Sequence, residues 1–361
     1  MRTARQISLF LFAFFALVVS AGAQDARRIV TTQNGDYFGF DLRTEQNVSL
    51  EQCKNVCLGD AQCRAFTYNT RAEWCFLKSD FNRLNTFDGA VAGKVVVNGA
   101  AADIGAPPPL RFVADYVIQE AQQFKADTLK GASAGEEGFV SLVSSAGERL
   151  ASGDPHSAMR AYRAAIAIEP QDAQLWSGLA RAAIAADPIP NVTSYALQRT
   201  GTGAAITAYT LSRSTDDRAE ALAALAAALE KRNMFRPAIS AYEASLALRG
   251  VQEVQALYAD LKSRKGFRIL DHTVDSDSAS PRICVQFSED LVKSGVDYAQ
   301  YMTVENERNV AIDRSERELC VSGLKHGGQY RVVVRQGLPS AIGEVIAQPS
   351  ALEIYIRDRA P

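Results

Sequence analysis

The stretch LEQCKNVCLGDAQCRAFTYNTRAEWCFLKS, residues 50–79, decides the fold of the N-terminal module, because it holds four of the six cysteines of the 361-residue chain. Cys53 and Cys57 are four residues apart, a spacing that places both side chains on one face of a helix beginning near Ser49. The two later cysteines lie in segments that alternate apolar and polar residues as strands do. The pattern predicts a helix held to a small sheet by disulfides, which is typical of a binding module rather than a catalytic centre.

These residues resemble the PAN/Apple family, whose core has the pattern C-x3-C-x5-C-x-x-F-x-Y followed by C-x-L-K. The chain carries both halves of this pattern between Cys53 and Lys78. The residues alone allow three pairings of the four cysteines. The resemblance implies the pairs Cys53–Cys75 and Cys57–Cys63. It also implies the short form of the domain, without the bridge that joins the termini of longer Apple domains.

Residues 1–23 are typical of a secretory signal peptide. Two arginines precede the apolar run ISLFLFAFFALVVS, and the small residues AGA follow it as a cleavage site. The run is shorter than the roughly 20 residues that a membrane-spanning helix needs, and no other run approaches that length. Six cysteines suit an oxidising compartment. We therefore expect a periplasmic or secreted protein, exported through a cleaved signal peptide and without a membrane span afterwards.

Composition and motifs argue against nucleic-acid binding and catalysis. The formal net charge is −2 and no basic block is present, so nucleic acid is not an expected partner. The sequence has no hydrolase, zinc-protease or phosphate-loop motif, so we expect no enzyme activity, no catalytic residue, no metal and no cofactor. The acidic residues Asp271, Asp275 and Asp277 lack the calcium-loop spacing, and a solvated turn is the expectation there.

The chain divides by composition into four segments after the signal peptide. Residues 28–98 form the PAN/Apple module, and residues 99–109 are a Pro/Ala/Gly linker. Residues 110–265 are alanine-rich and helical, and residues 266–361 have β patterns. The predicted fold class is multidomain α+β: a small disulfide-bonded PAN/Apple domain, α-helical hairpins, and a C-terminal immunoglobulin-like β-sandwich.

The helical segment contains two copies of one pattern, a small residue followed by an aromatic and then by another small residue. The copies are Ala158, Tyr162 and Ala165, and Ala238, Tyr242 and Ser245. This pattern resembles the second helix of a tetratricopeptide (TPR) repeat, in which small residues let helices approach and the aromatic fills the gap. The resemblance implies two to three TPR-like hairpins, with a generic helical bundle as the alternative.

Two further expectations concern side chains that could be core or site. Cys284 and Cys320 lie in predicted strands, opposite to the apolar face, and they can form a disulfide if those strands are neighbours; otherwise they are separate thiols. The aromatic residues of the cysteine-rich stretch and Trp176 are expected in the core rather than in a ligand pocket. The aromatic residues meant are Phe66, Tyr68, Trp74 and Phe76.

A second resemblance covers essentially the whole mature chain. Beyond the order of the modules, it rests on GFRILD at residues 266–271 and VDSDSASPRICVQFSE at residues 274–289. GLKHG at 323–327, GLPSA at 337–341 and YIRDRAP at 355–361 complete it. These stretches are similar to the N-terminal region of bacterial alpha-2-macroglobulin family proteins, which are periplasmic protease traps. The sequence has no Cys-x-Glu-Gln thioester motif, and it ends before the expected bait and macroglobulin regions.

The resemblance implies a non-catalytic accessory or interaction region of a periplasmic protease inhibitor, lacking the bait and thioester regions. Its partners would be proteins, either proteases or cell-envelope proteins, bound by the PAN and TPR-like modules. The alternative is a freestanding periplasmic scaffold whose PAN/Apple module binds a protein or a carbohydrate and whose helices bind a protein.

Overall fold

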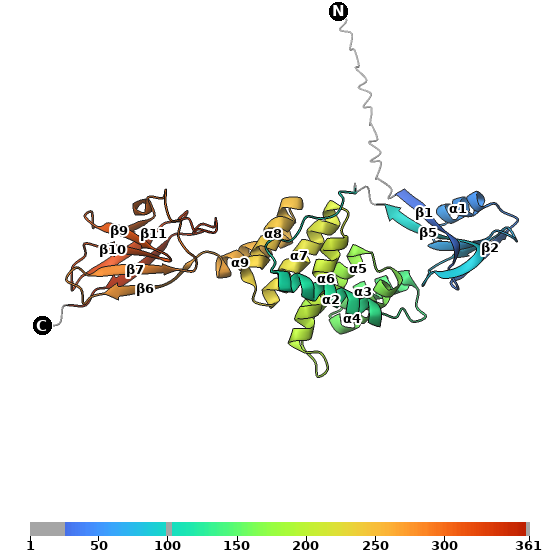
Figure 1. Ribbon diagram of the computed structural model, residues 1–361, viewed down its shortest axis with the longest axis horizontal. Helices are drawn as coiled ribbons and strands as arrows, with labels where there is room; N and C mark the ends of the chain where they lie inside the picture. Colours follow the sequence, from blue (N-terminus) through green and yellow to red (C-terminus); the bar gives the residue numbers. More distant parts are fainter. Residues whose placement is uncertain (1–25, 99–102, 359–361) are drawn as a thin grey trace, which may run out of the picture. The chain divides into compact units, whose positions relative to one another are not determined.

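The computed structural model describes residues 26–98 and 103–358 of the chain (Figure 1). The signal peptide expected at residues 1–23 and the start of the expected linker lie outside the described residues. The chain forms two compact units, and the first comprises residues 26–36, 41–79 and 86–98. Loop segments 37–40 and 80–85 belong to the second unit together with everything from residue 103 onward. Within the described ranges, no helix combines the length and apolar content that a membrane span requires.

The first unit is a five-stranded sheet with one helix. The strand order is β1 (Ala26–Asp36), β5 (Asn85–Asn98), β3 (Ala65–Asn69), β4 (Trp74–Lys78) and β2 (Asp41–Gln46), and the helix is α1 (Leu50–Gly59). Strand β3 pairs antiparallel with β4 and β5, and β4 pairs antiparallel with β2. Ser49 begins the helix with a capping box, in which Ser49 and Gln52 each accept a hydrogen bond from the other's backbone N–H.

The core of this unit depends on a glycine opposite a phenylalanine. Phe66 of β3 is fully buried and lies directly across from Gly93 of β5. A Cβ atom at Gly93 would lie 2.2 Å from the Phe66 ring, so only glycine fits there. The ring packs with the four cysteines, Leu77 and Val91 in one cluster. A core this small gains much of its stability from disulfides.

Among its described residues, the second unit contains eight α-helices, arranged largely as hairpins. They are α2 (Asp115–Gly131), α3 (Phe139–Ala151), α4 (Pro155–Ile168), α5 (Ala173–Ala185), α6 (Ser194–Leu211), α7 (Thr215–Lys231), α8 (Phe235–Leu248) and α9 (Gln252–Lys265). The pairs α3 and α4, α5 and α6, and α7 and α8 each pack closely, and consecutive pairs also contact one another. Helix α2 packs against α6, and α9 packs against α8.

The repeated small–aromatic–small pattern is buried in both α4 and α8. Tyr162 is buried, and a Cβ atom at Gly178 of α5 would lie 2.3 Å from its ring, so the two helices approach closely at that point. Tyr242 occupies the equivalent buried place in α8. Trp176 is fully buried, donates its indole N–H to the Pro170 carbonyl at 3.0 Å, and meets the Phe124 ring edge-on. The expected core position of Trp176 is confirmed.

The last part of the chain contains two small sheets around one core. The first has the order β6 (Ile269–Asp275), β7 (Arg282–Phe287), β10 (Glu318–Ser322) and β9 (Ala311–Ser315). The second has the order β12 (Ser350–Tyr355), β11 (Gln329–Val334) and β8 (Met302–Val304), and a short 3-10 helix spans Tyr298–Gln300. Strand pairs in both sheets are antiparallel, and apolar residues of both sheets share one buried cluster. The finer immunoglobulin-like assignment stays a prediction.

Candidate functional site

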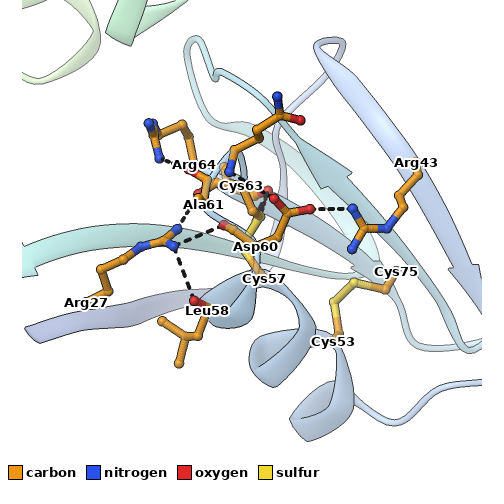
Figure 2. Close-up of a disulfide and its surroundings, with 12 residues drawn as sticks. Arg27, Arg43, Cys53, Cys57, Leu58, Asp60, Ala61, Cys63, Arg64 and Cys75 are labelled. Atoms are coloured by element: carbon orange, nitrogen blue, oxygen red, sulfur yellow. Dashed lines mark hydrogen bonds and ion pairs between the residues drawn. A yellow bond between two sulfur atoms is a disulfide. The ribbon is translucent and has the colours of Figure 1, made fainter.

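Two disulfides join helix α1 to the rest of the first unit. Cys53 bonds to Cys75 of β4, and Cys57 bonds to Cys63 in the loop before β3 (Figure 2). All four cysteines are fully buried. Since the two helical cysteines lie one turn apart, each reaches a different segment of the module. The disulfides fix the helix rather than present a reactive group.

Arg27 holds the C-terminal end of α1 from outside the helix. Its guanidinium donates to the carbonyls of Leu58 at 3.2 Å, Asp60 at 3.0 Å and Cys63 at 2.6 Å (Figure 2). The last turn of α1 has no basic residue of its own, so Arg27 supplies the cation that a helix C-terminus favours. Arg27 lies one residue before the module predicted at residues 28–98, and nothing in the local sequence pattern marks it as a partner of α1.

The aromatic residues of this module divide into core and surface. Phe66 and Tyr68 are buried, and the Tyr68 hydroxyl donates to the Val48 carbonyl at 2.9 Å. Trp74 is instead 38% exposed, so its expected core position is wrong. Its place at the first residue of β4, directly after the 70–73 turn, explains the difference, because fewer side chains cover a strand there. The half-buried Phe76 ring lies 6.2 Å from the Trp74 ring.

The third disulfide lies in the C-terminal sheets. Cys284 of β7 and Cys320 of β10 are directly opposite each other in an antiparallel pair, and they are bonded. They alternate with core residues, as expected for the opposite face of the strands, yet both are buried. Glu318 lies near both sulfur atoms. Because a metal needs a thiolate and these sulfurs are bonded to each other, the three residues do not form a metal site in this state.

The acidic residues expected in a solvated turn lie partly in a strand. Asp271 and Asp275 belong to β6, which corrects the expectation of a turn for them. Asp275 Oδ2 lies 3.5 Å from Nε of Arg282, and Asp277 forms an ion pair with Arg357. In the described part of the chain, none of the three belongs to a group of ligands close enough to share a cation.

A groove runs along α5, α7 and α9, as two adjoining cavities of about 500 and 670 Å³. Ile184, Ala227 and Leu257 line both cavities, so the two form one continuous surface. Between charged residues at its two ends, the wall on α7 is made of alanines, among them the partly accessible Ala223 and Ala227. Leu257 of α9 is 45% exposed. The groove can therefore take apolar side chains of a bound chain.

Charged side chains edge this groove. Arg181 of α5 forms an ion pair with Glu220 of α7 at one end. At the other end, Arg264 contacts Glu230 at 2.9 Å, and the Lys265 ammonium lies 4.6 Å from the centre of the Phe235 ring. An apolar floor with charged ends is the chemistry of a peptide-binding groove. The sequence predicted helices that bind proteins, but its pattern marked none of these residues.

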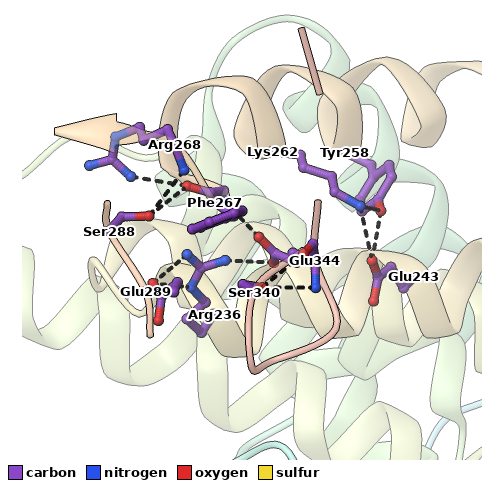
Figure 3. Close-up of polar contacts among 11 residues, drawn as sticks. Arg236, Glu243, Tyr258, Lys262, Phe267, Arg268, Ser288, Glu289, Ser340 and Glu344 are labelled. Carbon is purple, nitrogen blue, oxygen red and sulfur yellow. Dashed lines mark hydrogen bonds and ion pairs between the residues drawn. The ribbon is translucent and has the colours of Figure 1, made fainter. Parts of the chain in front are cut away.

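Arg236 of α8 connects the helices to the C-terminal sheets. Its guanidinium donates to Glu289 at 3.1 Å through Nε and to Glu344 at 2.5 Å through Nη1 (Figure 3). Glu344 also accepts a hydrogen bond from the Phe267 backbone N–H at 2.7 Å. Burial by itself would lower the pKa of Arg236, but its bonds to Glu344 and Glu289 outweigh burial and raise it. The guanidinium is therefore firmly charged.

Comparisons with known proteins bear chiefly on the first module. No curated protein matches the chain. The solved TPR domain of Arabidopsis OM64 is 12% identical, with a TM-score of 0.29 over 35% of this chain and 94% of that one. The first TPR of Spaghetti (RPAP3), solved with an HSP90 peptide, is 16% identical, with a TM-score of 0.30 over 35% of this chain and 91% of that one.

The N-terminal part of the bacterial S-layer protein SbsC is 14% identical, with a TM-score of 0.20 over 67% of this chain and 57% of that one. TM-scores this low carry no argument about the fold. The match to a family is specific in contrast: residues 28–92 match the PAN domain family. This part of the chain is a PAN domain.

Proposed function

We propose that the chain is a non-catalytic binding region, in which the groove on α5, α7 and α9 holds a segment of a partner protein and the PAN domain provides a second contact. The groove is the observation that carries this proposal. Its volume, its alanine wall and the exposed Leu257 offer apolar area that the protein itself leaves uncovered. The charged residues at both ends would fix the direction of a bound chain.

The finer proposal is that this region serves a periplasmic protease trap of the alpha-2-macroglobulin type. Its support is the resemblance of residues 266–289 and of the later glycine-containing stretches to that family. Three disulfides favour an oxidising compartment, as export to the periplasm would provide. In such a protein the TPR-like helices and the PAN domain would bind the protease or a cell-envelope protein, and trapping would be performed elsewhere.

A carbohydrate is the second candidate ligand, and it concerns the PAN domain alone. The partly exposed Trp74 beside Phe76 offers an aromatic face of the kind on which sugar rings can stack. A glycan array probed with the mature chain and with Trp74→Ala tests this candidate. Glycan signals that disappear in the variant support it, and an array that is blank for both proteins contradicts it.

The groove is tested by affinity capture from periplasmic extract with the mature chain, followed by identification of the captured proteins. Ala227→Trp fills the groove, and Ala151→Trp adds the same side chain at an exposed position of α3. We expect Ala227→Trp to lose captured proteins that Ala151→Trp keeps. Direct titration of one such purified partner should then show at least tenfold weaker binding to Ala227→Trp. Equal binding to both variants would contradict the groove as the binding site.

The finer proposal has its own test. The DNA downstream of codon 361 should contain a macroglobulin-like reading frame, either continuous with this one or next to it. A stop codon without such a frame nearby would count against the protease-trap assignment and would leave the groove proposal unaffected.

A further inference from the structure

A cavity of about 510 Å³ lies between α2, α4 and α6, and it shares no lining residue with the groove on α5, α7 and α9. Three arginines line it: Arg160 and Arg163 of α4 and Arg199 of α6. Asp127 of α2 is its one acidic lining residue, so the lining has a net charge of +2 at neutral pH. Such an excess of positive charge in a concave site attracts anions.

Two of the three arginines form no ion pair within the described residues, although the Asp154 carboxylate lies close enough to Arg160 for a weaker electrostatic interaction. Arg199 lies 3.0 Å from Asp127. Arg160 donates to the Ser157 hydroxyl at 2.7 Å, and Arg163 has a longer contact of 3.4 Å with the Thr200 hydroxyl. Neither makes an ion pair with any residue in the ranges that the structure describes. A guanidinium has five N–H donors, so both leave most of their hydrogen-bonding capacity open.

Arg160 and Arg163 are exposed, so water still reaches both guanidinium groups. Partial burial nevertheless lowers the pKa of Arg163, because the surrounding helices replace some of the water that would solvate its charge. The pKa of Asp127 is lowered by hydrogen bonds from Gln123 and Arg199, so this carboxylate stays ionised and occupied by Arg199. A bound anion would supply the missing partner to Arg160 and Arg163.

The walls that carry these side chains are well fixed. Arg160 and Arg163 are three residues apart in one helix, so they share a face. Phe124 of α2 lines the cavity and packs tightly on α6, since a Cβ atom at Gly203 would lie 2.5 Å from its ring. The α2 and α6 walls of the cavity are therefore fixed to each other before any ligand arrives, which lowers the cost of binding.

We propose that this cavity binds a small, multiply charged oxyanion, recognised by the forked donors of Arg160 and Arg163. Phosphate groups and clustered carboxylates both match the planar guanidinium, which can bind two oxygens at once. The volume suits a small molecule. A ligand with at least two negative charges would neutralise the cavity, whereas a monoanion would leave one positive charge unpaired.

Isothermal titration of the mature chain with sodium pyrophosphate and with sodium citrate, at constant ionic strength, tests the proposal. We expect saturable binding of at least one probe. Binding of pyrophosphate alone would indicate a phosphate ligand, and binding of citrate alone would indicate a polycarboxylate. Binding of both would indicate a site that recognises negative charge. Binding of neither would overturn the proposal.

Variants show whether binding occurs in this cavity. Arg163→Gln should weaken binding at least tenfold, whereas Arg149→Gln, which removes the same charge from an exposed position on α3, should change it less than twofold. Equal losses of affinity would indicate non-specific attraction and overturn the site.

Asp127→Asn removes the cavity's negative charge and frees Arg199, so it should tighten binding at least threefold. Unchanged or weaker binding in a folded Asp127→Asn protein would also overturn it.

Discussion

Asp80 caps the N-terminus of helix α3 through Ser141, which lies 61 residues later in the chain. One carboxylate oxygen, Oδ2, accepts hydrogen bonds from the Ser141 backbone N–H at 3.0 Å and from its hydroxyl at 2.8 Å. The other, Oδ1, accepts from the Val140 backbone N–H at 2.8 Å. Gly138, the residue that precedes the helix, has no capping side chain. A buried carboxylate from a distant loop thus performs the role that a local Ser or Asp usually has.

Replacing Asp80 should destabilise the helical region. Asp80→Ala leaves the N–H groups of Val140 and Ser141 without their charged acceptor, and we expect a loss of about 2–3 kcal/mol in the free energy of unfolding. Urea unfolding followed by helical circular dichroism measures it. Asp88→Ala, which removes an exposed carboxylate, is the control and should change stability by less than about 0.5 kcal/mol. Equal effects of the two changes would contradict the capping role.

The two disulfides of the PAN domain should stabilise it by different amounts, because the loops that they close differ in length. The sequence separation is 22 residues for Cys53–Cys75 and 6 residues for Cys57–Cys63. On the chain-entropy account, replacing the first pair by alanines should cost about 3 kcal/mol and replacing the second about 2 kcal/mol. Urea unfolding of the PAN domain in the full chain would show the order of the two losses.

Peptide mapping without reduction should first find these two pairs together with Cys284–Cys320. No free thiol should remain in the mature protein. A free thiol at any of the six positions, or a pair linking the two sets, would show that the pairing in solution differs from the structure.

The local sequence pattern predicted those strands whose apolar side chains are buried in the core. The strands predicted to contain Cys284 and Cys320 are present in the structure as β7 and β10, because their alternating apolar residues enter the buried cluster. The β pattern of residues 266–361 did not single out strands β6, β8 and β9. Strand β6 contains Asp271, His272 and Asp275 and lies at a sheet edge, and β8 has only three residues, so neither shows a clear alternation.

Contacts between distant residues could not be predicted in this way. The pairing of Cys53 with Cys75 was implied by the resemblance to a family in which these cysteines are bonded. No sequence spacing or motif marks the hydrogen bonds of Asp80 and Arg27. The arginine cavity was missed for the same reason, since Arg163 and Arg199 come from helices whose packing the sequence does not specify. Sequence periodicity places a residue on a face but does not say which other face it meets.

Arg27 should contribute more to the stability of the PAN domain than its neighbour Arg28. Arg27→Ala removes three charge-assisted hydrogen bonds to carbonyls at the end of α1 and in the Cys63 loop. We expect it to lower the free energy of unfolding by about 1–3 kcal/mol. Arg28→Ala removes an exposed arginine and should stay within about 0.5 kcal/mol of the wild type. Urea unfolding of both variants measures the two changes. An equal loss of unfolding free energy in Arg27→Ala and Arg28→Ala would rule out the anchoring role of Arg27.

The junction around Arg236 should control access to the chain between α9 and β6. Arg236→Ala leaves Glu289 and Glu344 without their shared cation, and Glu344 also accepts from the Phe267 N–H in this connecting segment. We therefore expect the segment to open more often and trypsin to cleave after Lys265 or Arg268 several times faster, because proteolysis follows local opening. Arg249→Ala, at an exposed arginine that ends the same helix, is the matched control. Mass spectrometry of the first fragments gives the cleavage sites and their rates. If trypsin cleaves Arg236→Ala no faster than the wild type, the Arg236 guanidinium is not needed to keep the junction closed.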